Sequence, residues 1–199
     1  MTTDLVVATR NKKKLAEIKD LLAGLHFNVL STDDFPHIPE IEEDGETFEE
    51  NALKKASEVA KITKKLTIAD DSGLVIDHLD GKPGIHSARF AGENANDEDK
   101  NKKVLTLMKG VTMEKRTARF VCAVAIVNLK GENSIVKGIR EGIITTEPKG
   151  TEGFGYDPIF LIPEYGKTYA ELGVEMKNRI SHRAKALDKT KKVLISSFL

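Results

Sequence analysis

Two adjacent carboxylates, Asp70 and Asp71, follow a short apolar run and come just before a serine and Gly73. We expect residues 66–69 to form a buried strand and Gly73 to let the backbone turn sharply, so that both carboxylates lie at a strand end. Carboxylates there suit the binding of Mg²⁺ or the activation of water, because ligands of open α/β sheets bind at strand ends. Neighbouring carboxylates also repel each other unless a cation or a proton intervenes. The alternative is an ordinary turn, in which Asp, Ser and Gly are common.

Charged residues are segregated along the chain, although its 31 basic and 31 acidic residues give a net charge of zero. Residues 40–50 contain seven acids and no base, whereas basic residues cluster at 10–14 and 177–185. An acidic segment and two basic segments fit a metal ion with a polyanionic ligand. Each segment taken alone can also be a solvated face. The zero net charge argues against a partner that is a nucleic acid or a membrane surface.

The first basic cluster lies where a helix is expected to begin. An apolar strand at residues 5–8 precedes Thr9 and Asn11, two good helix N-caps, and apolar residues recur at helical spacing over 15–25. The lysines at 12–14 then fall in the first helical turn, where cations oppose the helix dipole. A phosphate group bound at that helix end would resolve the conflict.

A second candidate site is the glycine-rich loop at residues 153–158, which carries Phe154 and Tyr156 and leads into an apolar strand at 159–162. Aromatic residues in such a loop can form a stacking platform for a nucleobase. The alternative is an aromatic staple over the core. Farther on, Ser181 is a good N-cap for the last helix, and the cations around it indicate a second anionic or polar ligand.

The elements that must position these residues alternate between strands and helices. Further strands are expected at residues 27–30, 119–129 and 134–144, and helices at 47–61, with Thr47 as N-cap, and at 96–110. The run at 119–129 is apolar on both faces, which is typical of a central strand in a sheet covered on both sides. With 199 residues, of which 40% are apolar, we expect one globular protein with room for two lobes.

The remaining sequence features concern location and redox chemistry. No apolar run approaches the roughly 20 residues needed to span a membrane, and residues 1–5 lack the pattern of a signal peptide, so we expect a cytoplasmic protein without a membrane partner. Cys122 is the one cysteine and lies in an apolar run, so we expect a small buried side chain.

Six ordered motifs together resemble the inosine triphosphate pyrophosphatase family, also called the Ham1 or RdgB-type family. The motifs are ATRNKKK (8–14), TFEENA (47–52), ADDSGL (69–74), GIHSAR (84–89), GFGYDP (153–158) and SHR (181–183). The resemblance covers nearly the whole chain, although Arg10 and Lys13 stand where the commonest form of the family is rich in glycine.

The resemblance implies a fold and an activity. The fold is an α/β protein with a long mixed β-sheet flanked by helices. Residues 1–199 would form a single domain with two lobes and an active-site cleft between them, usually as a homodimer. The activity is hydrolysis of ITP, dITP and XTP to the monophosphate and pyrophosphate with Mg²⁺, which removes deaminated purines from the nucleotide pool.

The resemblance also implies roles for single residues. Asp71 would be the proton acceptor and a metal ligand, with Glu42 as the second metal ligand. The triphosphate would be held by Thr9, Arg10, Asn11, Lys12, Lys13, Lys14 and Lys55. The rest of the nucleotide would be held by Ser72, Phe154, Gly155, Tyr156, Asp157, Lys177, His182 and Arg183.

The chemistry of these residue types agrees with the implied reaction. Hydrolysis of a triphosphate needs cations and an oriented water but little covalent chemistry from the protein. Donors such as Lys177, His182 and Arg183 would favour the 6-oxo group of hypoxanthine and xanthine over the amino group of adenine. Two alternatives stay open: a nucleotide sensor that binds without turnover, and a pyrophosphatase for other modified nucleoside triphosphates. A lysine-rich nucleic-acid binder is disfavoured by the neutral charge and the acidic segment.

Overall fold

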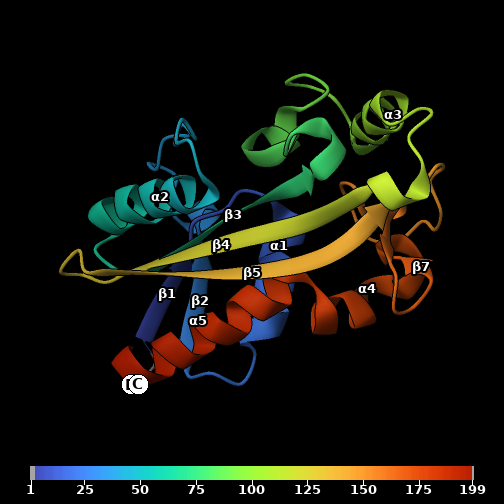
Figure 1. The fold of residues 1–199 in the computed structure, drawn as a ribbon. Coiled ribbons are helices and arrows are strands. Elements are labelled where there is room, and N and C mark those ends of the chain that lie inside the picture. Colours follow the sequence, from blue (N-terminus) through green and yellow to red (C-terminus); the bar gives the residue numbers. More distant parts are fainter. Residues whose placement is uncertain (1–2, 199) are drawn as a thin grey trace. The chain divides into compact units, whose positions relative to one another are not determined.

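The computed structural model describes residues 3–198 and contains a seven-stranded sheet with the strand order β2-β1-β3-β4-β5-β6-β7 (Figure 1). β1 pairs in parallel with β2 and β3, whereas β6 pairs antiparallel with β5 and β7. The strands are β1 (Thr3–Val7), β2 (Phe27–Ser31), β3 (Leu66–Ile76), β4 (Thr117–Val127), β5 (Asn133–Ile144), β6 (Phe160–Ile162) and β7 (Lys167–Thr168). The predicted α/β fold with a mixed sheet is therefore confirmed.

Five α-helices accompany the sheet in the described part of the chain. They are α1 (Lys12–Leu22), α2 (Phe48–Thr63), α3 (Asp97–Leu107), α4 (Tyr169–Ile180) and α5 (His182–Phe198). Asn11 caps α1 by accepting hydrogen bonds from the backbone N–H groups of Lys13 and Lys14, and Thr47 caps α2 through the N–H of Glu50. The N-terminal caps expected at Asn11 and Thr47 therefore form. None of the helices within residues 3–198 is long and apolar enough to cross a membrane.

The chain divides into two compact units. The first consists of Met1–Asp71, Cys122–Gly138 and Arg183–Leu199, and the second of Ser72–Val121 and Ile139–His182. The boundary cuts through β3, β4 and β5, so each of these strands contributes to both units. Each unit has its own apolar cluster.

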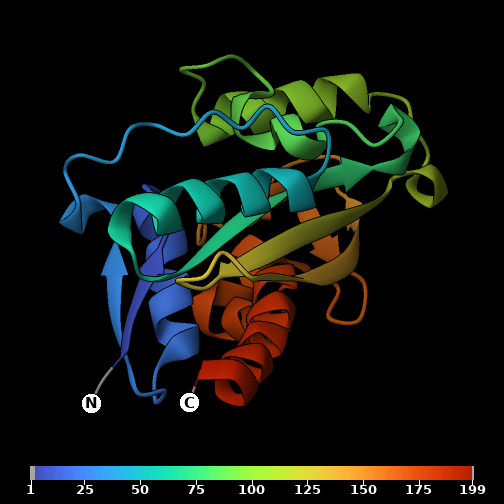
Figure 2. The ribbon, with the colours of Figure 1, turned by 90° about the vertical axis from the view of Figure 1, so that its left-hand side faces the viewer.

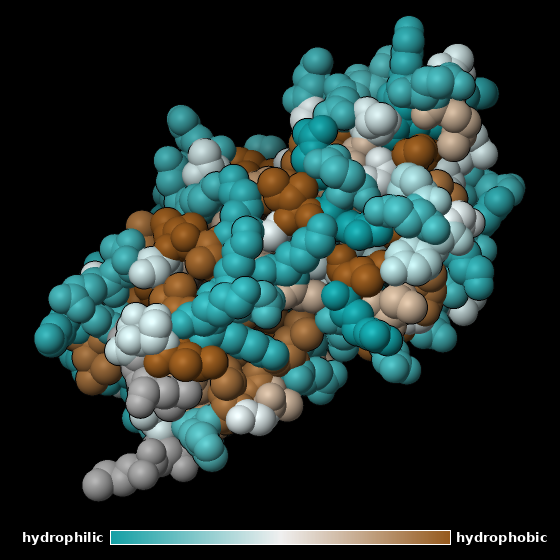
Figure 3. Space-filling view, turned by 60° about the horizontal axis from the view of Figure 1, so that its bottom comes forward, coloured by the Kyte–Doolittle hydropathy of each residue, from teal (hydrophilic) through white to brown (hydrophobic). Residues whose placement is uncertain are grey.

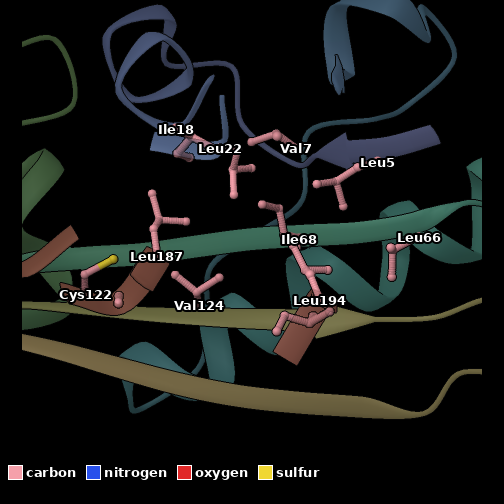
Figure 4. Close-up of a cluster of buried hydrophobic side chains, with 12 residues drawn as sticks. Leu5, Val7, Ile18, Leu22, Leu66, Ile68, Cys122, Val124, Leu187 and Leu194 are labelled. Atoms are coloured by element: carbon pink, nitrogen blue, oxygen red, sulfur yellow. The ribbon is translucent and has the colours of Figure 1, made fainter. Parts of the chain in front are cut away.

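In the first unit, α2 lies on one face of the sheet and α1 and α5 lie on the other (Figures 1 and 2). The buried cluster between the sheet and α1 and α5 is shown in Figure 4. Its members are Leu5, Val7, Ile18, Leu22, Leu66, Ile68, Cys122, Val124, Ile126, Ala186, Leu187 and Leu194. Side chains along β3 alternate between faces, so Leu66 and Ile68 face α1 and α5, and Thr67 between them faces α2. Cys122 is buried as expected, and burial together with the Asp70 charge raises the pKa of its thiol to about 12.

In the second unit, the apolar cluster combines the ends of β3, β4 and β5 with α3, β6 and α4. Its members are Leu74, Ile76, Val104, Met108, Ala118, Phe120, Ile144, Tyr156, Ile159, Phe160, Ile162 and Tyr169. Arg116 is buried in this unit and donates hydrogen bonds to the carbonyls of Ile144 (2.6 Å), Met108 (2.7 Å) and Thr145 (2.6 Å). This side chain joins the end of α3 to the end of β5.

Two expectations about local structure are wrong. β3 does not end before Asp70 but continues without interruption from Leu66 to Ile76, and Gly73 lies inside it. The apolar residues on both sides of the carboxylates extend the strand, and the carboxylates are tolerated there because cations lie against them. Lys177 does not lie at a helix start but in the last turn of α4, a helix that the sequence reading did not identify.

Candidate active site

The two adjacent carboxylates lie inside a strand and therefore point to opposite faces of the sheet. The Asp70 side chain contacts Lys14 of α1 and Arg183 of α5, on the face that those two helices cover. The Asp71 side chain contacts Asn51 and Lys55 of α2, on the other face. The two carboxylates consequently have different surroundings and different partners, which adjacency in the sequence does not reveal.

Asp70 is held between two cations. Its Oδ2 atom lies 3.2 Å from Lys14 Nζ and 3.2 Å from Arg183 Nη2, and the residue is only 2% exposed. Burial alone would raise the pKa of this carboxyl, but the charges of Lys14, Arg183 and Lys55 outweigh it and hold the pKa far below its ordinary value. Asp70 is therefore a permanent anion, and its charge orders the two cations around it.

Arg183 connects two buried carboxylates within the first unit. Its guanidinium donates from Nη1 to Glu17 of α1 and from Nη2 and Nε to Asp70. Burial would lower the pKa of this guanidinium, but Asp70 and Glu17 raise it further than burial lowers it. The arrangement places Arg183 beside Asp70 in the first unit, whereas the loop that carries Phe154 belongs to the second unit.

Nearby cations compensate the negative charge of Asp71 less fully than that of Asp70. Asn51 donates a hydrogen bond from Nδ2 to Asp71 Oδ2 (3.2 Å), and Lys55 Nζ lies 4.0 Å from Asp71 Oδ1. Burial is the main reason that the pKa of Asp71 is raised; Glu43 and Asp70 add to the rise, and Lys55 and Lys14 oppose it. A carboxylate with a raised pKa is a better proton acceptor than an ordinary one.

Lys55 lies between two carboxylates as a metal ion would. Its ammonium contacts Glu43 Oε1 (2.7 Å) and the backbone carbonyl of Asp70 (2.7 Å) and is 4.0 Å from Asp71. Two carboxylates near one cation position are a donor set that suits Mg²⁺, which binds one or two carboxylates and takes its other ligands from water and phosphate. No cluster of three or more His, Cys, Asp or Glu side chains able to hold a metal occurs in residues 3–198. Glu42, the residue expected to be a metal ligand, is exposed, and its role stays a prediction.

The basic segment at the start of α1 adjoins this strand. Ala8, at the end of β1, donates a backbone hydrogen bond to the Ile68 carbonyl (2.7 Å), so the segment begins beside the carboxylate pair. Thr9 accepts a hydrogen bond from the N–H of Asn11, and Arg10 donates to the Ile38 carbonyl. Lys12 and Lys13 are exposed in the first turn of α1. Within residues 9–14, it is thus Lys14 that contacts one of the paired carboxylates, Asp70.

The loop expected to bind the base forms a separate cluster in the second unit. Lys177 Nζ pairs with Asp157 Oδ2 (2.7 Å) and lies 4.1 Å from the centre of the Phe154 ring. The same carboxylate oxygen accepts the backbone N–H of Phe154 (2.8 Å). Gly153 allows this approach, because its φ is +81° and a Cβ there would come 2.2 Å from Asp157 Oδ2. The four residues form a compact cation–aromatic group.

The other residues expected to contact the nucleotide also lie in the second unit. Tyr156 donates its hydroxyl to the Ser87 carbonyl (2.8 Å), and burial raises the pKa of that hydroxyl. The His182 ring stacks on Phe120 with centroids 4.6 Å apart. Ser72 follows Asp71 inside β3 and is half-buried.

Several residues of the two clusters were not identified from the sequence. Asn51 lies within the segment 47–52 that had been noted, but nothing in its local pattern links it to Asp71. Glu17 meets Arg183 across 166 residues of sequence. Helical spacing from Lys14 was the one available signal for Glu17, since residues three apart lie on one face of a helix.

Comparisons with known proteins match the chain along nearly its whole length. The model of the Ham1 family matches residues 5–193. A dITP/XTP pyrophosphatase from Geobacter sulfurreducens is 56% identical over 93% of both chains, and one from Bacillus subtilis is 49% identical over 96% of both. Among solved structures, a HAM1 protein from Coxiella burnetii superposes with a TM-score of 0.90 at 42% identity, covering 98% of this chain and 100% of that one. The Staphylococcus aureus Ham1 protein gives a TM-score of 0.88 at 39% identity, with 97% and 98% covered.

Proposed function

The chain belongs to the Ham1 family, and from that premise we propose that it hydrolyses ITP, dITP and XTP to the nucleoside monophosphate and pyrophosphate. The observation that carries the proposal is Asp71, a buried carboxylate beside Lys55, which also pairs with Glu43. In a chain about half identical to dITP/XTP pyrophosphatases, this group is equipped to take a proton from water. The reaction removes deaminated purines from the nucleotide pool.

The first unit carries the phosphate chemistry in this proposal. Asp71 orients a water molecule and accepts its proton while the oxygen attacks phosphorus and the bond between the α and β phosphates breaks. Lys14 and Lys55 lie close to the carboxylates and neutralise charge on the departing pyrophosphate. Thr9, Asn11 and the exposed lysines 12 and 13 present further donors to the triphosphate.

We propose Mg²⁺ as the cofactor, with Asp71 and Glu43 as its carboxylate ligands and Glu42 as the further ligand that the family resemblance implies. The raised pKa of Asp71, to which burial and the Glu43 charge contribute, is relieved when a cation binds between the two carboxylates. When bound, Mg²⁺ supplies charge neutralisation for the triphosphate and lowers the pKa of coordinated water.

The second unit carries base recognition in this proposal. Phe154 offers its ring for stacking, while Lys177 and His182 offer donors that suit the 6-oxo group of hypoxanthine and xanthine. Adenine would present an amino donor to these donors and be disfavoured. It stays a prediction that a cleft lets one nucleotide place its triphosphate on the first unit and its base on the second.

The deciding experiment incubates purified protein and Mg²⁺ with ITP, XTP, ATP or GTP and measures pyrophosphate and orthophosphate separately. Pyrophosphate released chiefly from ITP and XTP supports the proposal. Orthophosphate as the main product would mean a phosphatase. Tight ITP binding without turnover would favour a nucleotide sensor, and preferential cleavage of other modified nucleotides would favour a different pyrophosphatase.

A homodimer and a cytoplasmic location are further predictions from the family resemblance. Figure 3 shows hydrophobic side chains interspersed with hydrophilic ones on one face of the protein. Light scattering on the purified protein measures the oligomeric state directly, and a monomer at micromolar concentration would contradict the prediction.

A further inference from the structure

We infer that Asp97 and Asn101 of α3 are positioning residues for base recognition, which they control by holding the backbone N–H and C=O of Gly155. This inference rests on the proposed function, because it concerns how the loop that carries Phe154 is presented to a purine base. Neither residue belongs to any of the motifs that carry the family resemblance. Both lie outside the cluster of Phe154, Asp157 and Lys177 described above.

Asp97 and Asn101 bind the two polar groups of one residue. Asp97 Oδ2 accepts the N–H of Gly155 at 2.7 Å, and Asn101 Nδ2 donates to the Gly155 carbonyl at 3.0 Å. The two side chains are four residues apart and therefore lie on the same face of α3. Because both the donor and the acceptor of Gly155 are engaged by one rigid helix, the orientation of this residue is fixed.

The helix end that provides these contacts is well anchored. Asn96 and Asp99 form a reciprocal capping box at the start of α3, and Asp97 Oδ1 also pairs with Lys100 at 2.7 Å. Asn101 is buried, at 5% exposure. The first turn of α3 is thus a fixed platform.

Gly155 is the residue at which the loop needs such support. Its φ of +64° is in the left-handed region, and glycine has many other accessible conformations. It follows Phe154, whose N–H bonds Asp157 and whose ring lies under the Lys177 ammonium. If Gly155 rotated, Phe154 and Asp157 would be displaced on either side of it, and Lys177 would lose its position over the ring. The two contacts from α3 thus act on base recognition through the loop.

The two contacts from α3 lie in the second unit, which predicts that they affect base recognition and not the phosphate chemistry. Asp97, Asn101 and the loop all belong to the second unit, whereas Asp71, Lys14 and Lys55 belong to the first. Loosening the loop should therefore weaken discrimination between bases and raise the KM for ITP, with little change in kcat. A residue needed only for stability would alter the turnover of all nucleotides alike.

The test compares Asp97→Ala with Asp97→Asn and with Glu98→Ala. Asp97→Asn keeps an oxygen that can accept the Gly155 N–H. Glu98→Ala removes a neighbouring exposed charge from the same helical turn and is the matched control. Steady-state kcat and KM are measured with ITP and ATP, and inhibition by inorganic tripolyphosphate reports on the phosphate site alone.

We expect Asp97→Ala to raise the KM for ITP and to reduce the ITP-to-ATP ratio of kcat/KM, each by about 10-fold, as for loss of one charge-assisted hydrogen bond. Inhibition by tripolyphosphate should be unchanged. Asp97→Asn and Glu98→Ala should stay within about twofold of the wild type. An unchanged base ratio in Asp97→Ala, or equal loss in Asp97→Asn, would overturn the inference.

A second variant guards against misfolding of Asp97→Ala. Asn101→Asp keeps the side-chain shape but places an acceptor against the Gly155 carbonyl, and it should reduce the base ratio in the same way. Wild-type protein that binds ITP without hydrolysing it would overturn the proposed function. The ratio of Kd values for ITP and ATP in the same variants would then decide the inference.

Discussion

Replacing Asp70 and Asp71 separately by asparagine should have opposite effects on stability. Asn has nearly the same shape as Asp, so the change removes the negative charge with little change in packing. Asp70→Asn leaves the half-buried Lys14 and the buried Arg183 around a neutral amide. Asp71→Asn instead removes a buried carboxylate whose pKa is raised by burial and by neighbouring anions. The first change therefore breaks a favourable arrangement, and the second relieves an unfavourable one.

The size of the Asp70→Asn effect follows from its burial. Removing one partner of a buried ion pair destabilises a protein by about 3–5 kcal/mol. For a chain of 199 residues, that loss corresponds to a Tm decrease of roughly 6–20 °C. Asp71→Asn should leave the Tm unchanged or raise it at pH 7, while it abolishes ITP hydrolysis.

The pH dependence separates the two carboxylates further. The pKa of Asp70 is lowered from 3.8 in the folded protein, so its stabilising contribution is complete above pH 3.8 and is lost as the pH falls through the folded value. The pKa of Asp71 is raised, so its ionisation costs stability as the pH rises from 3.8 through the folded value. The stability gap between wild type and Asp70→Asn should be constant from about pH 5 to 8 and shrink below about pH 4.

The assay is urea unfolding of the wild type and both variants between pH 3.5 and 8, with ITP turnover measured at neutral pH on the same preparations. Asp20→Asn, an exposed change on α1, is the control for a simple loss of charge. Two results would refute the assignment of the two carboxylates to opposite environments. One is an Asp70→Asn protein that is as stable as the wild type, and the other is an Asp71→Asn protein that is much less stable than the wild type. A folded Asp71→Asn protein with near wild-type turnover would refute its role as the proton acceptor.

Three further predictions test the rest of the structure. Arg116→Met should lower the free energy of unfolding, measured with urea, by roughly 3–5 kcal/mol. The reason is that the carbonyls of Met108, Ile144 and Thr145 would stay buried without their donor. A loss below about 1 kcal/mol would contradict this account. Gly142→Ala should cost about 1–3 kcal/mol, since a Cβ there would lie 2.4 Å from the Phe160 ring, and a Tm equal to that of the wild type would show that the ring can move aside. Removal of divalent metal with EDTA should abolish ITP hydrolysis and added Mg²⁺ should restore it, so activity that persists in EDTA would contradict the metal prediction.

Local sequence patterns predicted the elements well where side chains interact with near neighbours. The cap at Asn11 and the cap at Thr47 were both expected, because such caps need only residues two or three positions apart. The long strands β4 and β5 were also expected within two residues of their ends. The helix α4 was not identified, since Gly173 interrupts it with a φ of +80° and weakens its helical pattern.

The site could be predicted as a set of residue types but not as a set of contacts. Asp70 and Asp71 were expected at a strand end because charged residues rarely continue a buried strand. Their partners Arg183 and Asn51 lie 113 and 20 residues away in the sequence. Long-range pairing of this kind leaves no periodic signal, so neither the continuous strand nor the separation of the two carboxylates was accessible to pattern reasoning.

Position inside a strand accounts for the different properties of two identical neighbouring side chains. In a loop, Asp70 and Asp71 would share one environment and repel each other. On β3, alternation sends Asp70 toward Lys14 and Arg183, where it is a fixed anion, and sends Asp71 toward Lys55, where its pKa is raised. The ordered ion pairs on one face hold the strand that presents the reactive carboxylate on the other. A rigid strand is also a more accurate support for such a group than a flexible turn. The interior of β3 is therefore a better place for the proton acceptor than the strand end that the sequence first indicated.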